Sequence, residues 1–332
     1  MQGDYFDNSI PCLYQNNATS TFLFAYSNDL DPQDITDILN MMANKMPLWN
    51  FARYGNVRLD SEKPEDIEYH DNFQNFRSSV SSKLPDPKLT FIDQTSESNV
   101  MSVLETFSTT TRTPLCGSVV QLVLKRHTND TEYYDLNNLY SSLEKQHISV
   151  FCAASFDPLA GTSYYPASNM TLDTNGMIAF AEDEDLKWVV SSFLQVIRPQ
   201  SLVYATNVMR FQGNNSVVLP QLYIPQTPNG PETDHTWVTL DVSVQDTTAS
   251  PIKFQWFSLT CVYKDHNETS SLSRLMASST MTGEAWRMRV GPAEKLILSY
   301  EYPVDWSEPR AYMQFRIYVD FPVADWPPVN FS

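Results

Sequence analysis

Glycine is scarce in this chain, which has only nine glycines in 332 residues. The two that stand closest together, Gly283 and Gly291, are eight positions apart. That spacing excludes the glycine-rich loops of dinucleotide-binding and P-loop proteins, and also the G-x-S-x-G turn of α/β hydrolases. Three large classes of enzymes are therefore excluded at the start.

Positive charge is scarce as well. The chain has 22 Lys and Arg residues against 39 Asp and Glu residues, which gives a formal net charge of −17. Its largest basic cluster is Lys125-Arg126-His127. A surface with this balance repels phosphate polymers, so a basic arm that grips nucleic acid is excluded.

Cysteines and long apolar runs are few. No C-x-x-C motif occurs. Four cysteines allow two disulfides, but they are few for a chain of 38.0 kDa. We therefore expect free thiols in reducing cytosol. The chain has no apolar run that approaches about 18 residues, the length of a membrane-spanning helix, so no membrane span is predicted. The first residues show no signal peptide, and the Asn-x-Ser/Thr sequons are therefore interpreted as unused. The cysteines are Cys12, Cys116, Cys152 and Cys261, and the sequons begin at Asn17, Asn129, Asn169, Asn214, Asn267 and Asn330.

Aromatic residues make up 13 % of the chain and Ser, Thr and Asn are abundant, a composition that favours β-structure. Residues 1–98 are punctuated by proline and show little apolar periodicity, so we expect an extended N-terminal arm. One helix is predicted within it over 31–46, because Asp31 is a suitable N-cap and Pro32 suits the first helical position. Its apolar residues follow at helical spacing: Ile35, Ile38, Leu39, Met42 and Met46.

From about residue 100 the apolar period becomes two, which is typical of β-strands. The clearest case is 238–244, where Val238 and Leu240 alternate with Thr239 and Asp241, and we predict one buried face and one face in water. Short helices are expected over 136–143 and 182–193. Many strands with few helices predict an all-β, antiparallel sandwich over 99–265, followed by a C-terminal extension over 266–332 with two further strands.

Three segments, in this order, resemble the capsid proteins of picornaviruses and of their dicistrovirus and iflavirus relatives. The first is 139–154 followed by 156–167. The second is 198–202 leading to Asn214-Asn215-Ser216 and a strand closed by Pro220. The third is 237–244 with 254–263. The chain departs from the family at Gln200, where histidine is frequent in another frame, and in the roughly seventy residues that follow the last matched strand.

The resemblance implies an eight-stranded antiparallel jelly roll with short helices. Its strands B to I would lie at 100–107, 119–125, 148–154, 162–172, 202–211, 215–224, 237–245 and 254–263. The function it implies is that of a structural capsid protein of a small non-enveloped positive-strand RNA virus. Such a chain would assemble in host cytoplasm with sister subunits into an icosahedral virion, contact packaged RNA only weakly or indirectly, and in some cases bind a host receptor.

Two other functions are weighed against this one. A lectin-like or adhesin-type binding module is suggested by the tryptophans Trp286, Trp306 and Trp326, although tryptophan in β-proteins usually serves the core. An enzyme is not expected, and no catalytic, cofactor-binding or metal-binding residue is assigned. Asp265-His266-Asn267 is interpreted as a solvated turn. The acidic segment 182–185 is interpreted as a helix start, with a Ca²⁺ site as the alternative.

Overall fold

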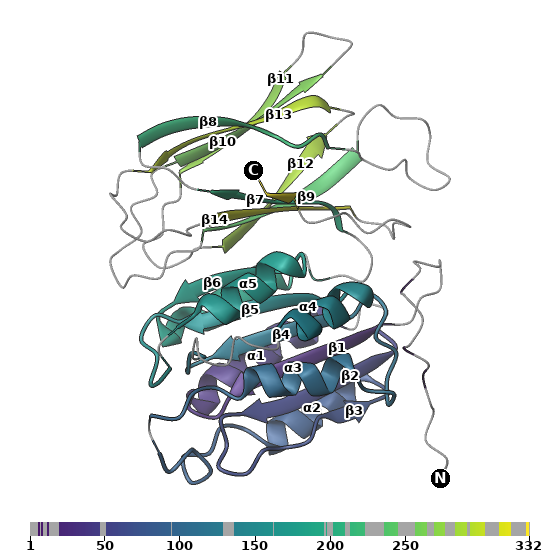
Figure 1. Ribbon diagram of the computed structural model, residues 1–332, viewed down its shortest axis with the longest axis vertical. Helices are drawn as coiled ribbons and strands as arrows, with labels where there is room; N and C mark the ends of the chain where they lie inside the picture. The colour runs from purple at the N-terminus through teal and green to yellow at the C-terminus, as the bar shows by residue number, and fades with distance from the viewer. Residues whose placement is uncertain are drawn as a thin grey trace.

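The computed structural model describes the following parts of the chain: Phe6, Asn8, Cys12 and residues 20–46, 51–93, 95–128, 136–161, 163–195, 197, 202–209, 213–222, 236–244, 256–263, 269–275, 283–290, 293–302, 312–319 and 330–331. They form two stacked units, an α/β unit and a β-sandwich (Figure 1). The α/β unit comes first in the chain, and the sandwich follows it.

The α/β unit is built on a six-stranded sheet with the order β3-β2-β1-β4-β5-β6, in which every neighbouring pair is parallel except β2 with β3. The helices α1, α2 and α6 pack on one face of this sheet, and α3, α4 and α5 pack on the other. The elements are β1 (Thr21–Ser27), α1 (Pro32–Lys45), β2 (Arg53–Leu59), β3 (Glu68–His70), α2 (Phe73–Ser82), α3 (Val100–Ser108), β4 (Val119–Leu124), α4 (Leu136–Lys145), β5 (Ser149–Ser155), α5 (Tyr165–Asp173), β6 (Met177–Ala181), the 3₁₀ turn η3 (Asp183–Asp185) and α6 (Leu186–Phe193).

The central strands are buried on both faces, as parallel sheets covered by helices require. In β1, Phe22 and Phe24 enter the core beneath α1, α2 and α6, whereas Leu23 and Ala25 enter the core beneath α3, α4 and α5. Helix α1 confirms its prediction, since the Asp31 side chain accepts a hydrogen bond of 2.7 Å from the backbone nitrogen of Gln33. Its apolar stripe, which includes Ile35, Ile38 and Met42, is fully buried.

The sandwich consists of a four-stranded sheet with the order β11-β10-β13-β8 and a five-stranded sheet with the order β12-β9-β14-β7-β15. Its strands are β7 (Leu202–Met209), β8 (Gly213–Leu219), β9 (Thr236–Val244), β10 (Trp256–Tyr263), β11 (Thr269–Leu275), β12 (Gly283–Val290), β13 (Ala293–Tyr302), β14 (Tyr312–Val319) and β15 (Asn330–Phe331). The five-stranded sheet lies between the other sheet of the sandwich and the α/β unit (Figure 1). It is the middle layer of the molecule.

Polar side chains on the middle layer join the two units. The Gln314 side chain accepts a hydrogen bond of 2.9 Å from the backbone nitrogen of Ile178, and thereby meets the edge strand β6. The Arg316 guanidinium donates to the carbonyl oxygens of Asn175 and Gly176, at 2.9 and 3.1 Å, just beyond the end of α5. Because Gln314 and Arg316 are both fully buried, the two units are in direct, dry contact here.

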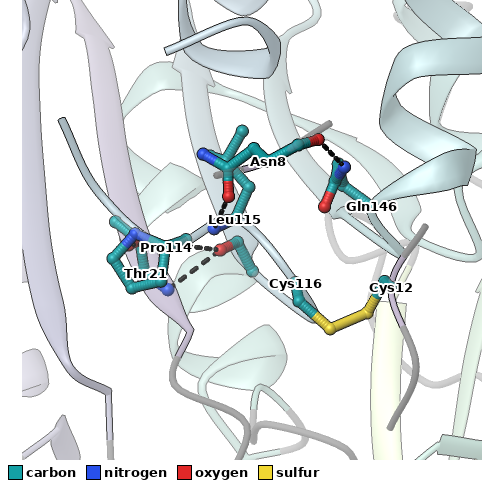
Figure 2. Close-up of a disulfide and its surroundings, with 8 residues drawn as sticks. Asn8, Cys12, Thr21, Pro114, Leu115, Cys116 and Gln146 are labelled. Carbon is teal, nitrogen blue, oxygen red and sulfur yellow. Dashed lines mark hydrogen bonds between the residues drawn. A yellow bond between two sulfur atoms is a disulfide. The ribbon is translucent and has the colours of Figure 1, made fainter. Parts of the chain in front are cut away.

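A disulfide between Cys12 and Cys116 ties the N-terminal segment to the loop before β4 (Figure 2). Hydrogen bonds flank it: the Gln146 side chain donates to the Asn8 carbonyl oxygen at 2.6 Å, and the Leu115 backbone nitrogen donates to the Asn8 side chain at 3.4 Å. The expectation of free thiols is therefore wrong for this pair. Cys152 is free and buried, and burial raises the pKa of its thiol.

The jelly-roll prediction is wrong, because the chain is mixed α/β. Two of the strands that the resemblance implied, 100–107 and 162–172, coincide with the helices α3 and α5. In α3, Val100, Leu104 and Phe107 are buried at helical spacing, and in α5 Pro166 lies in the first turn, where proline favours a helix. The resemblance alone placed a strand over 100–107, whereas packing of this segment against the sheet makes it a helix.

Residues 1–98 and 266–332 also differ from their expected roles as arm and extension. The first range supplies β1, β2 and β3, and β1 lies in the centre of the sheet between β2 and β4. The second range supplies β13 and β14, which are interior strands of their sheets, with a paired strand on each side. Asp241, expected in water, is fully buried against the α/β unit. The helices expected over 136–143 and 182–193 coincide with α4 and with η3 and α6.

Candidate functional site

The carboxyl ends of β1 and β4 are the place where a ligand would be expected. The chain runs from β1 outward to β2 on one side, and from β4 outward to β5 and β6 on the other. In open α/β sheets, ligands bind in the crevice outside the carboxyl ends of the strands, at the point where the strand order reverses. Here that point lies between β1 and β4.

A buried ion pair occupies this position. Arg126, two residues beyond β4, donates from Nε to Asp29 Oδ2 at 2.5 Å, and Asp29 stands two residues beyond β1. The guanidinium also donates to the Ser96 carbonyl oxygen at 2.8 Å and lies 5.4 Å from the centre of the Phe91 ring. The side chains of Arg126 and Asp29 are 0 % and 6 % exposed, so the crevice is filled by the protein's own charges.

A second carboxyl group, Asp60, lies just beyond β2. It accepts a hydrogen bond of 2.5 Å from the Ser27 hydroxyl, and its backbone nitrogen donates to the Asn99 side chain at 3.0 Å. Burial raises the pKa of Asp60 to about 6, and the hydrogen bond from Ser27 opposes that rise. Asp60 also adopts a left-handed backbone conformation, with φ of 60°, which Asp and Asn tolerate better than most residues.

A third cluster joins the ends of β4, β5 and β6. Lys125 Nζ lies 2.6 Å from Asp183 Oδ2 and 3.3 Å from the Ser155 hydroxyl, which donates in turn to Asp183 Oδ1 at 2.5 Å. A serine beside a lysine has the composition of a nucleophile and base. Two features speak against that chemistry: the Asp183 carboxylate already pairs with the Lys125 ammonium, and Ser155 is fully buried.

His127 follows the same strand and lies in aromatic surroundings. Its ring is 6.4 Å from the rings of Tyr164 and Phe180, with edge-to-face geometry. Its Nε2 lies 3.3 Å from the Ser155 carbonyl oxygen, and burial lowers the pKa of the imidazole. A neutral histidine that is oriented by a backbone carbonyl serves packing here.

Metal binding has no support in the described part of the chain, where no group of three or more His, Cys, Asp or Glu side chains is arranged to hold an ion. The acidic segment 182–185 forms η3 at the start of α6, and its Asp183 is taken by Lys125. Among the described residues no helix has the length and apolarity needed to cross a membrane.

No residue of this site was assigned a role from the sequence. Arg126 entered only as part of the largest basic cluster, and Asp29 lies 97 positions away from it. The usable signal was polar residues directly after apolar strands, as in Lys125 and Arg126 after 119–124. Asn214, Asn215, Ser216 and Pro220, which carried the capsid resemblance, lie on or just after β8, far from this edge of the sheet (Figure 1).

Other residues singled out from the sequence fall elsewhere. Trp286 stands on β12, and the Asp265-His266-Asn267 turn, Trp306 and Trp326 lie outside the described residues. Trp286 therefore lies outside the site between β1 and β4.

No protein-family model matches this chain, and no curated protein matches it. Among solved structures, it is similar to the N-terminal domain of TFIIH p34, with 12 % identity over 54 % of this chain and 99 % of that one, and a TM-score of 0.39. It is also similar to proximal thread matrix protein 1 from the mussel byssus, with 10 % identity over 55 % of this chain and a TM-score of 0.37. This chain spans about half of the mussel protein's chain, 47 %. At these TM-scores neither likeness assigns a fold or a function.

Proposed function

We propose that this chain is a non-enzymatic binding protein of the adhesin type, which works in an oxidising compartment and presents a β-sandwich on an α/β base. The observation that carries this proposal is the internal pairing of charges at the carboxyl edge of the parallel sheet. The groups that an enzyme would direct at a substrate are committed to one another.

The pairing leaves little for catalysis. Arg126 is held by Asp29, and Lys125 by Asp183, and the hydroxyl of Ser155 has no exposed surface. A buried charge that lost its partner would be strongly destabilising, so a ligand cannot take Arg126 or Lys125 without disturbing the fold. Recognition is therefore assigned to the outer surfaces.

The disulfide supports the proposal that the chain works in an oxidising compartment. Disulfides persist in secreted and cell-surface proteins and are rare in reducing cytosol. The Cys12–Cys116 bridge closes a long loop, with a sequence separation of 104, and such bridges stabilise by restricting the unfolded chain. Conversion of both cysteines to serine is expected to lower the free energy of unfolding by about 4 kcal/mol. Denaturant unfolding with and without reductant measures this loss, and Cys152→Ala serves as the control that leaves the bridge intact.

The test of the function uses native protein whose thiols are alkylated before digestion. We expect a peptide in which Cys12 is linked to Cys116, and cross-linking of the same material to partner proteins through the sandwich. Alkylation of Cys12 and Cys116 would show that both thiols are free and would contradict the proposal of an oxidising compartment. A turnover that Ser155→Ala abolishes without unfolding the chain would contradict the non-enzymatic assignment.

The capsid function stays a prediction from sequence. The jelly roll that implied it is absent, so no observation on the described residues favours it over the binding role. Electron microscopy of native material, with an antibody against this chain, separates the two functions: uniform spherical particles that contain the chain would restore the capsid function.

A further inference from the structure

Strand β8 is an edge strand with unusual properties. It lies at the end of the four-stranded sheet and, among the described strands, pairs only with β13. Residues 211–222, which contain it, carry no charge, and its pairing with β13 runs without a register shift. The side chains of Asn214, Ser216 and Val218 are exposed, that of Val218 to 60 %.

Edge strands in general attract other strands, because the outward N–H and C=O groups of a sheet edge can pair with another chain. Natural proteins protect such edges with charges, prolines, bulges or a covering element. The other edges here follow that rule: β3 and β12 include charged residues, β11 includes Arg274, and β6 is met by Gln314. By these criteria β8, whose only such device is Pro220 just past its end, is the least protected of the edges of seven or more residues in the described part.

The sequence of β8 offers a different protection. Asn214, Asn215 and Ser216 form an Asn-x-Ser sequon, the acceptor for N-linked glycans in proteins that enter a secretory pathway. Asn214 is exposed near the start of the strand, on the same side as Ser216 and Val218. Ser216 supplies the hydroxyl of the sequon, and that hydroxyl lies 3.2 Å from the hydroxyl of Ser299 on β13.

We propose that Asn214 carries an N-linked glycan that covers the β8 edge. This inference rests on the proposed function. N-linked glycosylation requires entry into a secretory pathway, and the Cys12–Cys116 disulfide indicates such an oxidising compartment. In the transfer, the bond between the anomeric carbon of a lipid-pyrophosphate-linked oligosaccharide and its phosphate oxygen breaks. A bond from that carbon to Asn214 Nδ2 forms, one amide proton is lost, and the lipid pyrophosphate leaves.

The neighbouring residues make the site selective. Asn215 has the same side chain, but Val217 stands two positions after it, so it is no acceptor; its amide donates to the Gly213 carbonyl oxygen at 3.0 Å. The sequon at Asn169 lies on α5, where Asn169 is half-buried and its Thr171 is fully buried. Asn169 therefore offers a glycan much less room than Asn214.

The first experiment expresses the full chain behind a secretory leader in eukaryotic cells. Peptide-N-glycosidase in ¹⁸O water converts a glycosylated asparagine to labelled aspartate, which peptide mass spectrometry assigns to its position. We expect label at position 214, its loss in N214Q and S216A, and its retention in S216T and in the matched control N215Q. An unlabelled Asn214 in protein whose Cys12–Cys116 bridge has formed would overturn this inference alone. Failure of the bridge to form would count against the proposed function instead.

The second experiment tests what the glycan does. Light scattering after size exclusion is expected to show N215Q as monomer at every concentration, and N214Q with a dimer or larger species that grows with concentration. Adding Val218→Lys to N214Q should restore the monomer, because an edge lysine is another natural protection. The same lysine at Met209, which is also exposed but lies on the interior strand β7, should not restore it. An N214Q variant that stays monomeric would overturn the covering role.

Discussion

Two arginines, Arg126 and Arg316, are fully buried among the described residues, and they are accommodated in different ways. Arg126 faces the carboxylate of Asp29 within the α/β unit. Arg316 is surrounded by carbonyl oxygens, of Asn175, Gly176, Thr206 and Phe315, which come from both units. Asp241 stands directly opposite Arg316 on the neighbouring strand β9.

The difference shows what each charge does. Arg126 forms its ion pair beyond the carboxyl ends of β1 and β4, where open α/β sheets usually bind their ligands. Arg316 satisfies carbonyl groups just past the end of α5, at the negative end of the helix dipole, from a strand of the other unit. Burial lowers the pKa of Arg316 to about 10, while Tyr318 and Asp241 counteract part of that shift. Arg316 therefore stays charged at neutral pH, and its removal should affect both units together.

The largest expected effect is that of Arg316→Met. This change leaves several buried carbonyl oxygens and Asp241 without their cation, at a cost of about 3–5 kcal/mol in the free energy of unfolding. We also expect the unmodified chain to unfold in one calorimetric transition and Arg316→Met in two, as the sandwich and the α/β unit come apart. Arg77→Met, on the exposed surface of α2, is the control and should leave one transition. A loss of stability without splitting would place the role of Arg316 inside the sandwich alone.

Arg126→Met is expected to cost slightly less, about 3 kcal/mol, because it leaves fewer buried acceptors without their cation, chiefly Asp29 and the Ser96 carbonyl oxygen. The loss should be confined to the α/β unit. Adding Asp29→Leu should recover most of it, since an apolar pair often replaces a buried ion pair at little cost. A double-mutant cycle in urea measures the coupling, and a double variant as unstable as Arg126→Met would mean that the pair is not the relevant contact.

The next prediction concerns the carboxyl group beside this ion pair. Because the pKa of Asp60 is raised in the folded protein, the folded state binds this proton more tightly than the unfolded state does. The contribution of Asp60 to the free energy of unfolding is therefore largest below the ordinary pKa of aspartate. This contribution is lost as pH rises from about 4 to about 6. Asp60→Asn should flatten the pH dependence of unfolding in that window. Asp93→Asn is the control: hydrogen bonds from Thr95 lower the pKa of this exposed carboxyl, so its effect should fall mainly below that window. Equal slopes in wild type and Asp60→Asn would contradict the assignment.

The smallest effect is expected where an ion pair faces water. Lys187 on α6 lies 3.3 Å from Asp37 on α1, and solvent screens this pair. Lys187→Met should leave the melting temperature almost unchanged at any salt concentration. A large, salt-dependent shift would mean that surface pairs also hold these helices together.

Local features of the fold were predictable, and its long-range features were not. The Asp31 cap and the apolar spacing that follows it specify α1 from neighbouring residues. By contrast, β1 and β4 are buried on both faces, so neither shows the alternation that identifies a strand with one wet face. Their adjacency depends on contacts about a hundred residues apart, which local patterns do not encode.

The site shows the same limit. Alternation over 238–244 correctly separated the two faces of β9, with Asp241 opposite to Val238 and Leu240. The alternation could not tell whether water or protein covers the polar face of β9. A buried charge with a partner and a charge in water occupy the same positions in an alternating sequence. The pairing of Asp29 with Arg126 was hidden for the same reason.

The Cys12–Cys116 bridge also has a mechanical consequence. Tension applied to residues before Cys12 passes through the two sulfur atoms to Cys116, and from there straight into β4 at the centre of the sheet. The intervening segment, including β1, β2 and β3, is bypassed and bears none of that load while the bridge is intact. Reduction would reroute the same pull through β1, so the redox state of one bond decides which strand of the sheet resists force first.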